Sequence, residues 1–206
     1  MLLGAATSGI AAPIDFDLIG VNDPNLTAHV LFTYDGIDTI DIAITNTSLP
    51  AAGPDPRFTA FAFNVPTDVT GVLSFGGPAN WTDSFDPDSI NTPGQFGFYD
   101  LAGITGPNFN GGSPSAGIAR GDTFTFSFLL MGSDLNMLNQ SSFLDLPSFD
   151  PPGNPTEATQ FFIGRFQRTG SDEEGSDVAV RVPEPGSLLL LAMGLAALGF
   201  ARRQSS

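Results

Sequence analysis

The stretch Asp122-Thr-Phe-Thr-Phe-Ser-Phe-Leu-Leu-Met131 is the clearest structural signal in the sequence. Phe124, Phe126, Phe128 and Leu130 occupy every second position, and hydroxyl side chains separate the phenylalanines. Because successive side chains of a strand point to opposite faces, this period of two predicts a strand with one face buried and the other in water.

The same alternation recurs on both sides of this stretch. Asp35-Gly36 is a dipeptide typical of a hairpin turn, and residues 76–115 are expected to be loop-rich. A short helix capped by Ser133 is expected over residues 133–140. The further predicted strands are residues 14–19, 27–34, 39–45, 59–65, 69–75, 95–101, 160–167 and 177–182, the last of which is alternatively the start of an extended stalk.

This pattern decides the predicted fold class. About eight to ten short strands, punctuated by Gly and Pro, are typical of an antiparallel β-sandwich. We therefore expect an all-β, jelly-roll-like ectodomain over residues 13–168, followed by an acidic linker or last short strand over residues 169–182.

The composition limits the classes of partner and of chemistry. The chain has 206 residues, with 22 acidic and 7 basic side chains and a formal net charge of −15. Such a surface repels phosphate backbones, so nucleic acid is not expected as a partner. Cysteine is absent, which removes disulfides and thiolate metal sites, and 19 phenylalanines are available for the core.

The first 12 residues are apolar and small. Gly9-Ile10-Ala11 matches the small-x-small pattern of a signal-peptidase cleavage site, although no basic residue precedes the apolar run. We interpret residues 1–12 as a partial signal peptide.

The last two dozen residues combine three physically different pieces. Val182-Pro-Glu-Pro-Gly-Ser187 is expected to be extended, because its two prolines fix φ and remove backbone donors. The following LLLLAMGLAALGFA is uncharged and predicts a transmembrane helix, and Arg202-Arg203 ends it with positive charge. Residues 187–201 would cover roughly 22 Å as a helix, a short span that snorkelling arginines can complete.

This tail resembles the PEP-CTERM sorting signal, in the order Pro-Glu-Pro, hydrophobic helix and arginine pair over residues 183–206. The resemblance implies recognition by exosortase, an integral-membrane protease/transpeptidase that would supply the catalytic groups. It also implies a transient stay in the inner membrane of a Gram-negative bacterium, then delivery to the cell surface or exopolysaccharide matrix. The residues that the resemblance assigns to recognition are Pro183, Glu184, Pro185, Gly186, Arg202 and Arg203.

Signals for catalysis are weak by comparison. His29 is the single histidine and lies in a strand pattern, so a Ser/His/Asp triad or a histidine zinc site would have little support. Aromatic side chains suited to stacking on sugars are few, namely Trp81, Tyr34 and Tyr99.

Calcium is the one cofactor for which the sequence offers candidates. Asp83, Asp86 and Asp88 lie within six residues, and the acidic side chains of residues 172, 173, 174 and 177 crowd a later loop. Closely spaced oxygen ligands on loops suit Ca²⁺, but neither segment has EF-hand spacing, and solvated acidic loops and Asp-Pro turns are the favoured explanation of both.

The function predicted from these observations is that of an exported, non-catalytic protein of the cell surface or extracellular matrix, sorted by exosortase. The alternative is a permanently anchored module that binds carbohydrate or calcium. A third hypothesis, a secreted hydrolase, requires two carboxyl groups about 5–10 Å apart in one pocket.

Overall fold

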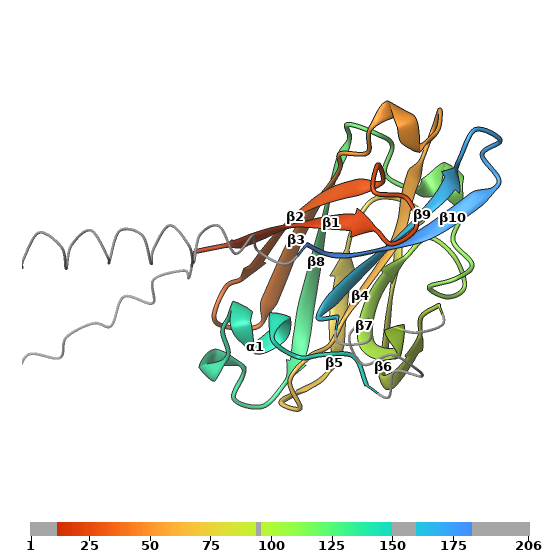
Figure 1. The fold of residues 1–206 in the computed structure, drawn as a ribbon. Helices are drawn as coiled ribbons and strands as arrows, with labels where there is room; N and C mark the ends of the chain where they lie inside the picture. The colour runs from red at the N-terminus through yellow and green to blue at the C-terminus, as the bar shows by residue number, and fades with distance from the viewer. Residues whose placement is uncertain (1–11, 94–95, 150–159, 183–206) are drawn as a thin grey trace, which may run out of the picture.

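A computed structural model describes residues 12–93, 96–149 and 160–182 (Figure 1). Short helical segments lie at Pro50–Ala52, Pro114–Ala116 and Leu135–Met137 (3₁₀) and at Gln140–Leu144 (α1). The strands are β1 (Ile14–Gly20), β2 (Thr27–Tyr34), β3 (Thr39–Asn46), β4 (Arg57–Phe63), β5 (Val69–Gly76), β6 (Thr82–Asn91), β7 (Phe98–Ile104), β8 (Thr123–Gly132), β9 (Phe162–Thr169) and β10 (Gly175–Arg181).

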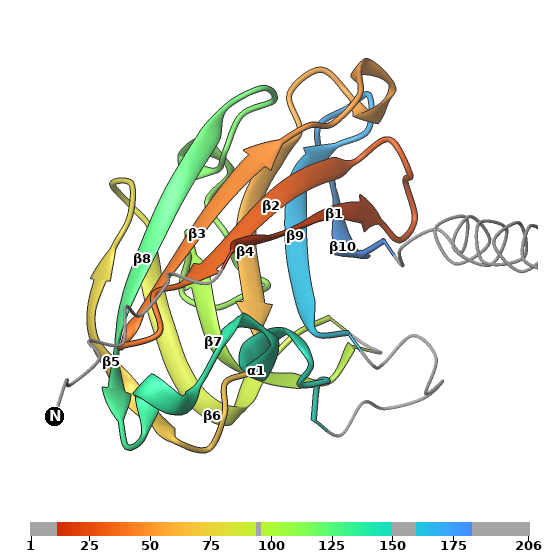
Figure 2. The ribbon, with the colours of Figure 1, turned by 90° about the vertical axis from the view of Figure 1, so that its left-hand side faces the viewer.

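All ten strands form one antiparallel sheet in the order β5-β8-β3-β2-β1-β10-β9-β4-β7-β6. The sheet curves strongly, so its two halves face each other and the edge strands β5 and β6 come close together (Figures 1 and 2). The predicted all-β antiparallel class is confirmed. The finer prediction of a jelly-roll-like sandwich needs correction, because β1 and β10 join the two layers into one hydrogen-bonded sheet.

Phenylalanines from both halves fill the space inside the curve. Phe61 of β4 packs on Phe126 of β8 at 4.9 Å between ring centroids, and it stacks on Phe162 of β9 at 5.7 Å. Phe61 is paired in register with Gly103 on one side and Gly164 on the other. The two glycines leave room for large rings on the inner face, and a methyl group on Gly103 would lie 2.5 Å from the ring of Phe61.

Most predicted strands are found within two or three residues of their expected bounds. The strand predicted from the opening stretch is β8, with Phe126 and Phe128 fully buried. Asp35 forms the expected hairpin turn, where its side chain accepts hydrogen bonds from the backbone N–H groups of Ile37, Asp38 and Thr39. These bonds outweigh burial, which would raise its pKa, and they hold the pKa of Asp35 below the ordinary value.

Two predictions about elements are wrong. The helix expected over residues 133–140 is replaced by a 3₁₀ turn and by α1, which begins later because Asn139 caps it by accepting a hydrogen bond from Ser142 N. The loop-rich middle contains β6, a ten-residue strand. Its Asp-Pro-Asp sequence conceals the alternation that identifies the other strands.

Within the described ranges, no helix is long and apolar enough to cross a membrane. The predicted transmembrane helix lies outside these ranges, as does the predicted signal peptide except for Ala12. Both stay predictions.

Candidate functional site

The predicted sorting residues follow directly on the last strand of the sheet. β10 pairs with both β1 and β9, so it is an interior strand. Val182 continues it by donating a backbone hydrogen bond to Asp17 O at 2.9 Å, and the Arg181 guanidinium lies 5.0 Å from the ring centroid of Phe16. The folded sheet therefore extends to the residue before Pro183, whereas Pro183, Glu184, Pro185, Gly186, Arg202 and Arg203 lie outside the described residues.

The acidic residues 83, 86 and 88 lie on β6 and not on a loop. Between Phe85 and Ile90, β6 contains more residues than its partner β7, which produces a wide bulge. Asp88 adopts a left-handed backbone (φ 52°) in this bulge, and its N–H donates to Asp100 Oδ1 at 2.7 Å. No group of three or more metal-ligating side chains is found in the part of the chain that the structure describes. The three aspartates are therefore not assembled into a metal site there.

Asp100, on β7, is the most unusual carboxyl group of the site. Its side chain is buried and accepts hydrogen bonds from Val65 N at 3.0 Å and from Asp88 N. Burial raises the pKa of Asp100, and the charge of Asp88 adds to this effect, although the two N–H groups act in the opposite direction. The sequence offered no signal for Asp100, because its burial and both of its donors come from distant segments.

Two grooves border the bulge. One, of about 290 Å³, is lined by hydroxyl, amide and carboxylate groups together with Ile90, Ile104 and Phe109. The other, of about 340 Å³, lies beside Asp88 and Asp100 and is otherwise mainly apolar. The second groove thus brings two acidic residues to one pocket, which is part of the arrangement that the hydrolase hypothesis requires.

The acidic segment at residues 172–177 is held by contacts within the fold. Asp177 is buried, and its carboxylate accepts from the backbone N–H groups of Asn22, Asp23 and Val178 and from Asn22 Nδ2, at 2.8–2.9 Å. Glu173 pairs with Arg168 in the turn between β9 and β10. These contacts hold Asp177 and Glu173 within the fold, and the calcium hypothesis for this segment stays a prediction.

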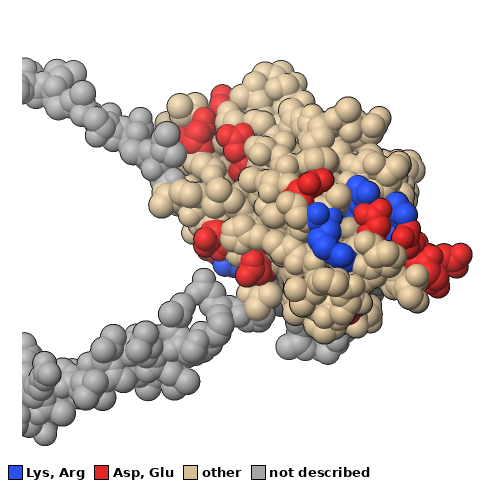
Figure 3. All heavy atoms as spheres, turned by 90° about the horizontal axis from the view of Figure 1, so that it is seen from above, with Lys and Arg blue, Asp and Glu red and all other residues tan. Residues whose placement is uncertain are grey.

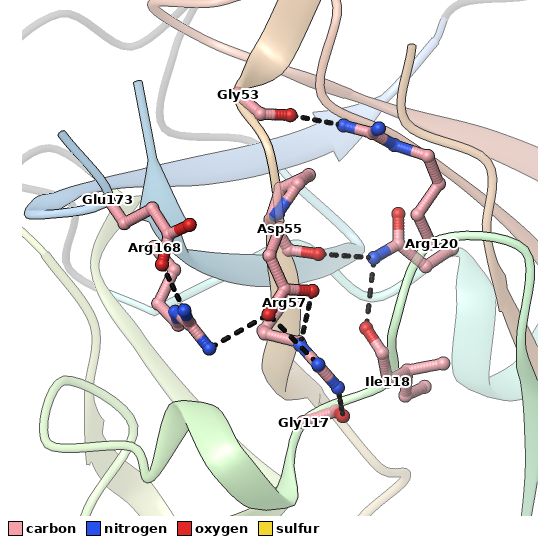
Figure 4. A network of polar contacts seen from close by, with 10 residues as sticks. Gly53, Asp55, Arg57, Gly117, Ile118, Arg120, Arg168 and Glu173 are labelled. Carbon is pink, nitrogen blue, oxygen red and sulfur yellow. Dashed lines mark hydrogen bonds and ion pairs between the residues drawn. The ribbon is translucent and has the colours of Figure 1, made fainter. Parts of the chain in front are cut away.

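Arg168 and Arg57 share Asp55 in a network at the same end of the molecule (Figure 4). Arg57 holds both oxygens of Asp55, at 2.8 and 2.9 Å, and Arg168 Nη1 lies 2.8 Å from Asp55 Oδ2. Arg120 donates to the carbonyl groups of Leu49 and Gly53. In the view of Figure 3, most of the basic surface is gathered in a single patch, where acidic atoms lie between the basic ones. The network ties loops together, and Asp55 and Glu173 neutralise the charges of Arg57 and Arg168.

The remaining candidates have structural surroundings. His29 is a partly exposed residue on β2 whose Nδ1 lies 2.9 Å from Asp17 Oδ1 across the β1–β2 pair. Trp81, Tyr34 and Tyr99 are buried and donate to backbone carbonyl groups. They provide no exposed ring on which a sugar can stack.

Comparison with known proteins assigns the segment that follows the sheet. Residues 181–203 match the model of the PEP-CTERM protein-sorting motif. The chain therefore carries this motif, which confirms the resemblance seen in Pro183-Glu184-Pro185. The motif implies export through the membrane to the cell surface and processing by exosortase. No curated protein and no solved structure matched the chain.

Proposed function

We propose that the mature protein is a non-catalytic component of the cell surface or extracellular matrix, which exosortase releases or transfers by a cut near Pro183–Gly186. The observation that carries this proposal is the position of the sorting motif. Its first residues, Arg181 and Val182, are the last that are bonded to the sheet. A cut at residues 183–186 would remove none of the described strands, so the ten-stranded domain would persist after processing.

The surroundings of the acidic residues support a non-catalytic role. Both oxygens of Asp177 accept hydrogen bonds from N–H donors. The two oxygens of Asp100 accept from the backbone N–H groups of Val65 and of Asp88 on β6, and they hold both segments in place. Such carboxyl groups maintain the backbone around the grooves and are poorly placed to exchange protons with a substrate.

The test is mass spectrometry of the protein recovered from its native host, with and without exosortase. We expect a C-terminus near residues 183–186 only when the enzyme is present. E184Q should reduce processing, whereas E174Q, which removes the same charge from a turn outside the motif, should not. An intact C-terminal segment in both strains would overturn the sorting proposal and favour the permanently anchored binding module.

A secreted hydrolase is the second candidate, and the pairing of Asp88 with Asp100 beside an apolar groove favours it. This hypothesis predicts that the purified protein cleaves a polysaccharide and that D100N abolishes cleavage without unfolding the sheet. The non-catalytic proposal predicts no cleavage product with either protein.

A further inference from the structure

Arg165, on β9, is a partly buried cation without a counter-ion. Its Nη2 donates to Ser176 Oγ at 3.1 Å, while its Nε is buried and has no hydrogen-bond partner. Among the described residues, no carboxylate forms an ion pair with it, in contrast to Arg57 and Arg168. Burial lowers the pKa of Arg165, and the nearby charge of Asp177 opposes this only in part.

The nearest acid is not available as a partner. Asp177 is the charge that acts on Arg165, but its two oxygens already accept four N–H groups, as described above. A desolvated guanidinium is costly unless an anion completes its hydrogen bonds. In a chain with a net charge of −15, the absence of such an anion among the described residues points to one that is supplied from outside.

Arg165 faces a pocket that an external anion can enter. The pocket has a volume of about 200 Å³ and opens at the surface. Its polar lining comes from Arg165, Ser176, Asn22 and Asp177, and its apolar lining from Val21, Pro93, Phe96 and Val178. One cation, a hydroxyl, an amide and a carboxylate thus line the pocket together with apolar side chains, in a space that accommodates a single sugar ring.

We propose that this pocket binds a uronic acid residue of an acidic polysaccharide. The carboxylate would be held by the guanidinium of Arg165, the ring hydroxyls by Ser176 and Asn22, and the C–H face of the ring would lie against the more accessible Val21 and Pro93. Arginine suits this task because its planar donors match a carboxylate. This proposal adds a ligand class to the proposed function at the cell surface or matrix, and its biological role rests on that function. The binding itself can be measured without any sorting step.

The test is an NMR titration of the full chain, purified in mild detergent, with galacturonic acid. Galactose serves as the neutral match, and N-acetylaspartate as a dicarboxylate without the sugar ring. We expect galacturonate to shift the backbone signals of Asn22, Arg165 and Ser176 in the wild-type protein, and galactose and N-acetylaspartate to shift them far less. R165Q should weaken galacturonate binding about tenfold or more, the loss expected for one charge-assisted contact.

R181Q is the matched control, because Arg181 lies over Phe16, forms no ion pair with a carboxylate of the described residues, and its loss changes the net charge equally. We expect R181Q to bind galacturonate as the wild type does. Equal weakening by both variants, or shifts scattered over the surface, would reduce binding to general electrostatics and overturn the proposal. If N-acetylaspartate bound as tightly as galacturonate, the ligand of this pocket would be an acidic peptide and not a sugar, and the proposal would be overturned. If R165Q does not fold, the shifts that galacturonate causes in the wild-type protein still test the proposal. These shifts do not depend on the outcome of the sorting test.

Discussion

Both halves of the sheet bury their inner faces, but they differ in how far their outer faces are covered. On β3, the outer residues Asp41, Ala43 and Thr45 are at least partly exposed, and the strand alternates strictly between buried and accessible positions. On β4, the outer residues Ala60 and Ala62 are fully buried, as is nearly the whole strand. One half therefore has a single covered face, and the other half has two.

The second cover comes from loops. Phe96 and Phe109, each just outside a strand, are almost completely buried in an outer cluster that also includes Ile104, Ile163 and Val178. Two of the three pockets described above occur on this side, with Phe109 and Ile104 lining one and Phe96 and Val178 lining the pocket of Arg165. The groove beside Asp88 and Asp100 is instead lined by Val65 and Val69 of the inner core. The difference teaches that covering the outer face with loops creates pockets along it.

The largest difference between the two outer faces is expected when the same substitution is made on each half of the sheet. Ala62 and Ala43 are both outer-face alanines, but only Ala62 is enclosed. A62D would bury a carboxyl group without a partner, and a pKa displaced by 3–5 units corresponds to a loss of about 4–7 kcal/mol in the free energy of unfolding. A43D should cost about 0.5 kcal/mol. Urea unfolding followed by circular dichroism measures both, and similar losses would show that the two faces do not differ.

The inner face should respond to truncation almost as strongly. F61A removes a ring that contacts Phe126, Phe128, Phe162 and Trp81, and a cavity should remain because the rigid sheet surrounds it on both sides. We expect a loss of about 3–5 kcal/mol in the free energy of unfolding. F149A serves as the control, because that ring is 55% exposed, and it should cost about 0.5 kcal/mol. A small effect of F61A would mean that the core can collapse around the gap.

The same contrast explains what could be predicted from the sequence. Strands with one covered face, such as β3 and β8, alternate visibly and were located closely. The strand β6 was missed because its bulge interrupts the alternation, and α1 was misplaced because its cap is Asn139 and not Ser133. The sorting motif is a linear pattern and was therefore recognisable, whereas Asp100 and Arg165 acquire their properties from burial among segments that are distant in sequence.

A smaller effect tests the fit between glycine and ring on the inner face. A Cβ on Gly103 would meet Phe61, and the aromatic cluster leaves little room for the ring to move, so G103A should cost about 1–3 kcal/mol. G76A is the matched control on the edge strand β5, where the nearest atom to a new Cβ is 3.6 Å away. Thermal unfolding should separate the two variants, and equal melting temperatures would show that the inner face is loosely packed.

The smallest effect concerns the covered outer face and its buried acid. Because the folded state raises the pKa of Asp100, folding favours the protonated carboxyl, and this contribution to stability is present below about pH 4 and is lost as the pH rises through the folded-state pKa. D100N keeps a neutral group at all pH values and loses one acceptor for a backbone N–H, at a cost of about 1 kcal/mol near pH 4. The stability difference between wild type and D100N should therefore narrow between pH 4 and pH 7 in urea titrations. If the difference widened instead, the two N–H donors would dominate over burial, and the bulge in β6 would be held by a carboxylate that the fold prefers ionised.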